Sequence, residues 1–141
     1  MYKRQIPDRE DDVVRLATRA FNSAAMGRAR LARRVLREVP FAVKVDGTIV
    51  EGFIDMLIQT SDGFEIVDWK TDDIASAEVD RRLDQYRTQA GLYALALAEA
   101  TGRAVSGITY VFLSLGIERD MGNVPALSAA ARERLLVIKS P

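Results

Sequence analysis

The most informative segment of the sequence reads Gly52-Phe53-Ile54-Asp55-Met56-Leu57-Ile58 and then, after a turn, Phe64-Glu65-Ile66-Val67-Asp68-Trp69-Lys70-Thr71. Large apolar residues dominate both halves, which is typical of strands buried in a core. Asp55, Asp68 and Lys70 interrupt them with charge. Removing an ion from water costs on the order of several kcal/mol unless the ion is paired or holds a metal. The sequence therefore predicts that these three charges form a site.

Two Asp-Gly pairs predict the turns of a three-stranded antiparallel meander. Asp46-Gly47 follows a segment that alternates apolar and polar residues over 41–45, and Asp62-Gly63 separates the two halves of the segment 52–71. If Asp62 and Gly63 form the second loop, Asp55 lies opposite Lys70. Asp68 then shares that face, because it is two residues from Lys70. A bulge would shift this register by one residue.

Two helices are expected before the meander. Acidic residues over 8–12 suit a helix N-terminus, and the apolar residues after them are spaced helically. Asn22-Ser23 is expected to cap a second helix that ends at Pro40. Its apolar face would carry Ala25, Ala29, Ala32 and Leu36. Its arginines, between Arg28 and Arg37, form either a solvated face or a phosphate contact.

The C-terminal half predicts a long helix, a buried strand and a last helix. Apolar residues spaced by three and four over 78–101 indicate a helix that Gly102 ends. The segment 109–115 is expected to be a strand parallel to the meander, with one short further strand near Ile117. Ser128 is expected to cap the last helix. The order ααβββαβα predicts an α/β domain with a mixed sheet flanked by helices.

The composition of the chain limits the kinds of reaction and of metal site that it can support. The 141 residues suit a single domain over 1–141, and the formal net charge is zero. The chain has no cysteine and no histidine, which excludes thiolate sites, disulfides and serine–histidine hydrolases. A metal site would use oxygen ligands, which favour magnesium, manganese or calcium. The sequence shows no membrane span and no signal-peptide core, so we expect a cytoplasmic protein.

Asp55, Asp68 and Lys70 can perform hydrolytic chemistry together. Two carboxylates can hold a hard divalent cation, and the cation stabilises charge on a phosphoryl oxygen and lowers the pKa of bound water. A lysine beside them can orient or help deprotonate the attacking water. The alternative is structural: an Asp68–Lys70 ion pair at a strand end, with Asp55 capping a turn.

Tyr86, Gln89 and Tyr93 lie on one side of the long helix, at positions i, i+3 and i+7. Such a face can contact a phosphate, a base or a catalytic carboxylate. Alternatively, the tyrosines pack in the core and Gln89 lies at its edge.

The motifs resemble those of the PD-(D/E)xK, or restriction-endonuclease-like, nucleases, and within them the RecB/AddA-type nuclease domain. The matching segments are Glu38-Val39-Pro40-Phe41, Gly52-Phe53-Ile54-Asp55, Ile66-Val67-Asp68-Trp69-Lys70-Thr71, Tyr86-Arg87-Thr88-Gln89 through Tyr93-Ala94-Leu95-Ala96-Leu97, and Tyr110-Val111-Phe112-Leu113. That domain commonly forms the C-terminal part of ATP-dependent helicase–nucleases that process double-strand breaks. The resemblance covers roughly residues 23–116.

This resemblance implies a restriction-endonuclease-like core and a Mg²⁺- or Mn²⁺-dependent deoxyribonuclease. It makes Asp55 and Asp68 metal ligands, together with the backbone carbonyl of Trp69, and Lys70 the catalytic lysine. It implies that Gln89 and Tyr93 contact DNA or support the metal shell, with Tyr86 beside them. Glu38 matches a recurrent acidic position. The implied partners are DNA, as single-stranded ends, and the helicase domains or subunits of a larger complex.

One motif of the family is missing. Its members usually carry a histidine or glutamate on an upstream helix that faces the metals, and Glu10 is poorly spaced for this role. We therefore expect the chain to be a C-terminal portion of a larger protein or a trimmed family member. Two alternatives to a nuclease stay open: a nuclease fold that binds DNA or a partner without cutting, and a scaffold with surface ion pairs.

Overall fold

The computed structural model describes the backbone of residues 2–139 and the side chains of residues 10–136. The elements follow in the order α1 (Tyr2–Phe21), α2 (Ala24–Leu31), β1 (Arg34–Val45), β2 (Thr48–Thr60), β3 (Gly63–Lys70), the 3-10 helix η1 (Ser76–Glu78), α3 (Val79–Thr101), β4 (Val105–Phe112), β5 (Ile117–Asp120) and α4 (Val124–Lys139).

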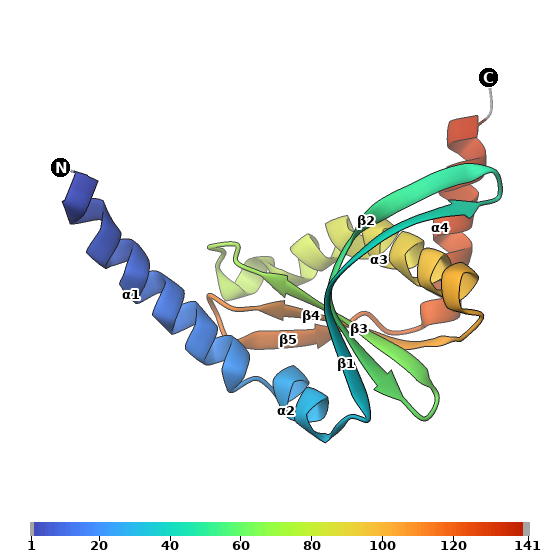
Figure 1. Ribbon diagram of the computed structural model, residues 1–141. Coiled ribbons are helices and arrows are strands. Elements are labelled where there is room, and N and C mark those ends of the chain that lie inside the picture. The colour runs from blue at the N-terminus through green and yellow to red at the C-terminus, as the bar shows by residue number, and fades with distance from the viewer. Residues whose placement is uncertain (1, 140–141) are drawn as a thin grey trace.

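The five strands form one sheet in the order β1-β2-β3-β4-β5, with β3 and β4 parallel and every other neighbouring pair antiparallel. Helices α3 and α4 lie on one side of the sheet, and α2 with the end of α1 lies on the other, while the rest of α1 extends away from the body (Figure 1). The predicted α/β architecture, with an antiparallel meander, one parallel strand and flanking helices, is confirmed.

Each face of the sheet has its own apolar core. Ile54, Ile66 and Phe112 pack on the α3 side, against helix residues that include Ala90 and Ala94. On the α2 side the buried cluster contains Ala25, Ala29, Met56, Ile58, Val67, Val111 and Leu113. A central strand such as β3 is therefore apolar on both faces, which explains its nearly continuous apolar sequence.

The turn at Asp46-Gly47 is a two-residue hairpin loop, as predicted. Val45 pairs with Thr48 across it, and both loop residues have positive φ, 48° for Asp46 and 81° for Gly47. Positive φ at both central residues is the mark of the turns that match the twist of paired strands.

The predicted loop of the second hairpin was wrong. The loop is Ser61-Asp62, because Thr60 pairs with Gly63. Gly63 has a φ of 142°, and a Cβ on it would lie 2.0 Å from the carbonyl oxygen of Ala104. Only glycine fits where β3 begins so close to the chain entering β4, so Gly63 belongs to the strand rather than to the loop.

The predicted extent of the second helix was also wrong. Helix α2 ends at Leu31, and Leu36 and Pro40 lie in β1. Val35 pairs with Ile58 and Leu36 with Leu57, so sheet pairing outweighs the helical spacing of the local sequence. Pro40 is tolerated because β1 is an edge strand, where a missing N–H breaks no second ladder.

The C-terminal half follows the prediction with shifted boundaries. Gly102 ends α3 in the left-handed conformation, with a φ of 68°. The buried strand is Val105–Phe112 rather than 109–115, and the short strand expected near Ile117 is β5. Ser128 lies inside α4, and the Asn123 side chain instead accepts from the Ala126 N–H at its start.

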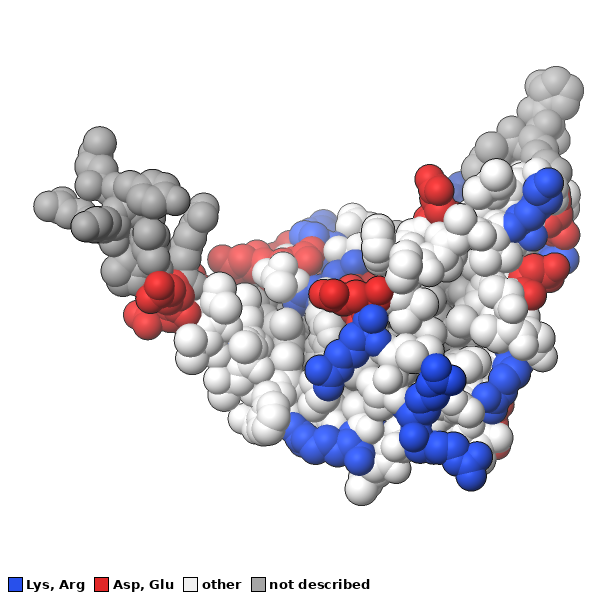
Figure 2. All heavy atoms as spheres, viewed as in Figure 1, with Lys and Arg blue, Asp and Glu red and all other residues white. Residues whose placement is uncertain are grey.

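Charge is unevenly distributed on the surface. In the view of Figure 2, lysine and arginine side chains gather over the lower part of the face, around α2 and the start of β1. Arg30, Arg33, Arg34 and Arg37 are exposed there. Within the described residues, no helix combines the length and the hydropathy needed to cross a membrane.

Candidate active site

The site lies where β2 and β3 separate. Their pairing ends at Met56–Val67, and the next residue of β2 is Asp55. Its Oδ2 accepts a hydrogen bond of 2.8 Å from the Trp69 backbone N–H. The carboxylate of Asp55 thus bridges the two strands beyond the last backbone pair.

The side-chain alternation of β2 breaks at Asp55. Ile54 belongs to the core under α3 and Met56 to the core under α2. In a regular strand, by contrast, residues that are two positions apart lie on the same face of the sheet. The pairing of β1 with β2 skips Glu38 and Asp55, and Glu38 has a φ of 50°. This paired irregularity turns Asp55 away from the core and into the gap between the strands.

The predicted partner of Asp55 was wrong, but the predicted grouping holds. Continuing the observed register places Asp55 opposite Asp68 rather than Lys70, because the loop is one residue earlier. The change in register is two residues, which preserves the face of each side chain. Lys70 Nζ lies 3.0 Å from Asp68 Oδ1, so the lysine joins the carboxylates directly.

Asp68 is buried, with 7% of its surface exposed. Burial raises the pKa of its carboxyl group, the neighbouring Lys70 opposes this change, and the charges of Asp55 and Asp72 add to it. The single ammonium group of Lys70 therefore does not fully neutralise the negative charge of these three aspartates. A carboxylate in such surroundings favours a further cation.

Lys70 packs against the rings of two tyrosines that contact each other, with centroids 5.2 Å apart. Its Nζ lies 4.0 Å from the ring centroid of Tyr86 and 5.3 Å from that of Tyr110. The Tyr86 hydroxyl donates to Asp72 Oδ2 at 3.1 Å, and Arg82 pairs with the same carboxylate. Tyr86, which we expected to be a DNA-binding or supporting residue, thus lies against the lysine.

Gln89 and Tyr93 both lie beside the site, and Tyr93 also packs against the core under α3, so the structure agrees with both alternatives that their spacing left open. Gln89 Oε1 accepts a hydrogen bond of 2.8 Å from the Tyr110 hydroxyl. Burial raises the pKa of the Tyr93 hydroxyl, and the charge of Asp68 raises it further. Tyr93 packs edge-on against Phe41, with ring centroids 5.0 Å apart.

Three residues of the site were given no role from the sequence: Gly52, Asp72 and Tyr110. A Cβ on Gly52 would lie 2.8 Å from the Tyr93 hydroxyl oxygen, so this glycine leaves the space that the tyrosine uses. Asp72 follows Lys70 by two residues, and this short spacing could have indicated that Asp72 lies near the site. Tyr110 becomes a neighbour of Asp68 only through the parallel pairing of β3 with β4, which no local pattern reveals.

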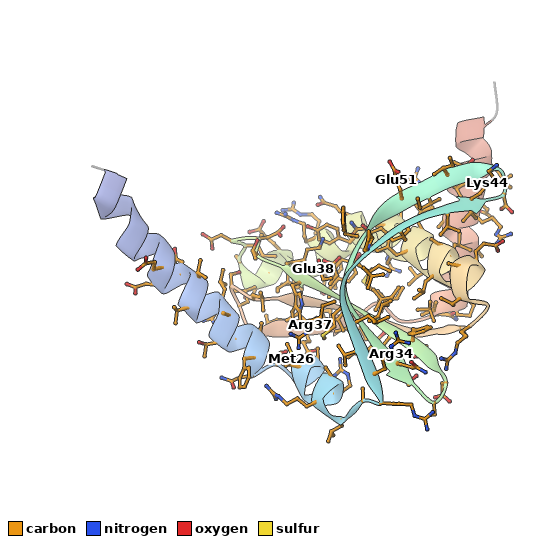
Figure 3. The ribbon with its side chains drawn as sticks, in the orientation of Figure 1. Met26, Arg34, Arg37, Glu38, Lys44 and Glu51 are labelled. Carbon is orange, nitrogen blue, oxygen red and sulfur yellow. The ribbon has the colours of Figure 1, made fainter. Side chains whose placement is uncertain are left out.

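A hollow of about 420 Å³ opens beside Asp55 on the α2 side of the sheet. Its lining consists of Ala20, Met26, Arg37, Glu38, Asp55, Met56 and Trp69. Figure 3 shows Glu38 and Arg37 next to each other on β1, with Met26 of α2 nearby. Glu38 is exposed, so its carboxylate faces the solvent at this hollow.

The carboxylate oxygens of the site suit a hard divalent cation that takes few of its ligands from the protein. Asp55 uses Oδ2 for Trp69, and Asp68 uses Oδ1 for Lys70, which leaves one oxygen of each carboxylate without a protein contact among the described residues. That part of the chain contains no group of three acidic, histidine or cysteine side chains placed to hold a metal. Water would therefore supply much of the coordination shell, as is common for magnesium.

Comparison with known proteins gives one family. The sequence profile of the PD-(D/E)XK nuclease superfamily matches residues 3–136. Among similar proteins, an ATP-dependent helicase/nuclease subunit of Carboxydothermus hydrogenoformans is 36% identical in a 97-residue alignment that covers 60% of this chain and 8% of that protein. The corresponding subunit of Desulforamulus reducens is 32% identical over 107 residues, covering 65% of this chain and 8% of that protein. The chain thus spans less than a tenth of these relatives.

Proposed function

Because the chain belongs to the PD-(D/E)XK nuclease superfamily, we propose that it hydrolyses DNA phosphodiester bonds with the help of Mg²⁺ or Mn²⁺. The observation that supports this most directly is the grouping of Asp55, Asp68 and Lys70 at the separation of β2 and β3. A domain that served only as a scaffold would gain nothing from this arrangement, because a buried carboxylate without a partner lowers stability.

In this proposal Asp55 and Asp68 hold the cation, with the Trp69 carbonyl as a further ligand. The bound cation would supply positive charge to the phosphoryl oxygens as the transition state forms. Lys70 Nζ, fixed by Asp68 and by the ring of Tyr86, hydrogen-bonds the attacking water and orients it toward phosphorus. The water oxygen bonds to phosphorus, and the bond from phosphorus to the leaving oxygen breaks. The proton of the water goes to solvent, and the leaving oxygen takes up a proton from solvent to become a hydroxyl group.

Gln89 and Tyr93 would position the strand from α3, and Glu38 would do so from β1. The Gln89 side-chain amide has two N–H donors that can face a phosphate while its oxygen accepts from Tyr110. Glu38 lines the hollow next to Asp55, where it can bind a water of the metal shell. Tyr86 would act through Lys70 rather than on DNA.

The partners that we propose are suggested by the relatives, which are named as subunits of an ATP-dependent helicase/nuclease. We propose that residues 1–141 form one nuclease domain of such an assembly and receive single-stranded ends from its helicase part. Action on chromosomal DNA would place the domain in the cytoplasm.

Cleavage of a labelled single-stranded oligonucleotide, with manganese or magnesium, tests the proposal. We expect Asp68→Asn and Lys70→Met each to lower the rate by about 100-fold or more, because each removes a group that acts on the reacting atoms. Lys44→Met, on the exposed part of β1, is the matched control and keeps the rate. Equal cleavage by Asp68→Asn and the wild type would contradict these roles.

A second candidate is a nuclease fold that binds DNA or a partner protein without cutting. The observation in its favour is that the described residues contain no group of three metal-ligating side chains. Calorimetric titration with manganese separates the two: heat of binding that disappears in Asp55→Asn supports the nuclease. A folded protein with no manganese binding at millimolar concentration supports the second candidate.

A further inference from the structure

The hollow beside Asp55 carries a cationic and an aromatic side chain that the reaction does not use. We propose that it is the end of a single-strand binding track, in which Arg33 and Arg37 bind phosphates and the Trp69 ring stacks on a base. This inference rests on the proposed function in taking DNA as the ligand. It adds the path by which a strand reaches the site, along the α2 side of the sheet.

Two hollows follow one another on this side. The first contains Arg37 together with Met56 and Trp69. The second, of about 540 Å³, contains Arg33 together with Ile58. Met56 and Ile58 belong to the same core beneath α2, so both hollows lie on one face of the sheet.

The spacing of the two arginines suits an extended ligand. Arg33 and Arg37 are four residues apart at the start of β1, which is roughly 13 Å in extended chain. The track therefore runs along β1 from Arg33 to Arg37 and ends at Asp55.

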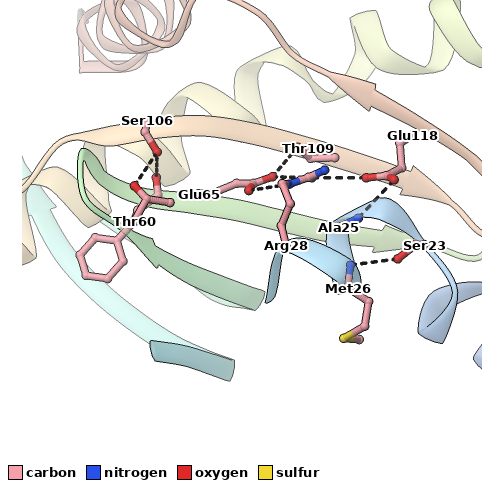
Figure 4. A network of polar contacts seen from close by, with 10 residues as sticks. Ser23, Ala25, Met26, Arg28, Thr60, Glu65, Ser106, Thr109 and Glu118 are labelled. Carbon is pink, nitrogen blue, oxygen red and sulfur yellow. Dashed lines mark hydrogen bonds and ion pairs between the residues drawn. The ribbon is translucent and has the colours of Figure 1, made fainter. Parts of the chain in front are cut away.

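Arg33, Arg34 and Arg37 are the arginines of this region that remain available, and by strand alternation Arg34 lies on the opposite face of β1 from Arg37. Arg28 makes two hydrogen bonds to Glu65, of 3.0 and 2.7 Å, and also reaches Glu118 (Figure 4). Arg30 donates to the carbonyl of Phe21 and stacks on its ring. Arg33 and Arg37 are exposed, and the described residues give neither of them an ion pair, so phosphates can bind both without breaking a structural contact.

The floor of the hollow favours a single strand over a duplex. Trp69 is partly buried and packs on the core beneath α2, so its ring is held in place, and Met26 adds an apolar neighbour. Unpaired bases stack on such rings, whereas the bases of a duplex present no free face. The arginines supply the attraction to the phosphate backbone.

The chain provides its own probe, because Trp69 is its only tryptophan. The experiment titrates the wild type with a thymidine oligonucleotide in EDTA, where metal-dependent cleavage cannot occur, and follows tryptophan fluorescence. We expect quenching, and about tenfold weaker binding for Arg37→Gln and for Arg33→Gln, since each loses a charge-assisted phosphate contact. In a variant that carries both substitutions, the slope of log K against the logarithm of the salt concentration should be shallower by about 1.4, at about 0.7 per lost phosphate contact.

Arg87→Gln is the matched control. It removes the same charge from the exposed surface of α3, where Arg87 pairs only with Asp84 among the described residues, and it should bind like the wild type. Circular dichroism checks that all variants are folded. Unchanged quenching in both Arg33→Gln and Arg37→Gln would overturn the track, as would equal quenching by polyglutamate or by a duplex of the same length.

The failure of the track and the failure of the proposed function give different results. Cleavage by the wild type with manganese, together with unchanged binding by the arginine variants, overturns the track and leaves the nuclease. Arginine-dependent quenching without any cleavage supports the track in a DNA-binding module and contradicts the nuclease.

Discussion

Gly52 controls the position of a proposed DNA-positioning residue although it has no side chain of its own. Its backbone runs directly beneath the Tyr93 hydroxyl, and the Phe41 ring closes the same space. A glycine in a strand usually weakens it, so this one has a packing reason. The hydroxyl of Tyr93 owes its place near Asp68 to that missing Cβ.

We predict that Gly52→Ala displaces Tyr93 and lowers cleavage. The new Cβ would lie 2.8 Å from the Tyr93 oxygen and 3.2 Å from Phe41 Cζ, so the tyrosine must move. We expect a loss of about 1–2 kcal/mol in the free energy of unfolding, the cost of inserting a methyl group into a packed site, and several-fold slower turnover.

Gly107→Ala is the control for Gly52→Ala. It lies in β4 with no atom within 4 Å of the position of its Cβ, so it should leave both quantities unchanged or slightly raise stability. If Gly52→Ala cleaves DNA like Gly107→Ala, Tyr93 does not position the strand.

At the scale of elements, α3 and α4 approach each other closely at Gly91. A Cβ there would lie 2.3 Å from the Leu127 carbonyl oxygen and 2.7 Å from Ala131 Cβ. This contact fixes α4 against α3 and thereby supports the buried side of the helix that carries Gln89 and Tyr93. A backbone oxygen, unlike the end of a flexible side chain, cannot turn away from a new methyl group.

We predict that Gly91→Ala destabilises the protein by about 1–3 kcal/mol, because overpacking outweighs the better helix propensity of alanine. Urea unfolding measures this. Gly27→Ala is the matched control in α2, where no atom lies within 4 Å of the new Cβ, and it should stabilise by about 0.5–1 kcal/mol. Stabilisation by both substitutions would mean that α4 is not held at this distance.

Helix α2 is positioned by charge as well as by packing. Glu65 of β3 is 9% exposed and accepts from Arg28 of α2 and from Thr109 of β4, and Glu118 of β5 accepts from the Ala25 N–H at the start of the helix. Strands β3 and β5 thus hold a helix of eight residues that would be marginal alone, and β4 supports Glu65. Its position defines one wall of the hollow at Asp55.

At the scale of the whole molecule, the negative charge of Asp68 opposes folding. Burial raises the pKa of Asp68, so its charged form is less stable in the folded protein than in the unfolded chain. This penalty is present at neutral pH and decreases as the pH falls through the pKa of the folded state, where the carboxyl group becomes neutral. With a cation bound to this carboxylate, the charged form of Asp68 would instead stabilise the folded protein.

We therefore predict a metal-dependent order of melting temperatures. In EDTA at about pH 7, Asp68→Asn should melt above the wild type, and the gap should close as the pH approaches about 4, near the ordinary pKa of an aspartate. Manganese should raise the melting temperature of the wild type and leave Asp68→Asn unchanged, by linkage of binding to folding.

Asp62→Asn, an exposed change in the β2–β3 turn, is the control and should respond to manganese like the wild type. A wild type whose melting temperature is the same with and without manganese would contradict the assignment of Asp55 and Asp68 as ligands.

Much of this molecule could be predicted because its patterns are local. The charges in apolar strands identified Asp55, Asp68 and Lys70, and the spacing on α3 identified Gln89 and Tyr93. Even the wrong loop left the grouping of the charges intact, because an error of two residues in register preserves the face of every side chain. The role of each residue stays a prediction for the experiments above.

The sequence alone determined the identity of the charged residues and the type of most elements, since alternation and helical spacing act over a few residues. Which residues face each other became clear from the tertiary structure. The Ala104 carbonyl assigned Gly63 to β3, pairing with β2 converted residues 34–40 from helix to strand, and the parallel pairing with β4 brought Tyr110 to Asp68. These outcomes depend on contacts between segments distant in the chain, whose energies no local pattern contains.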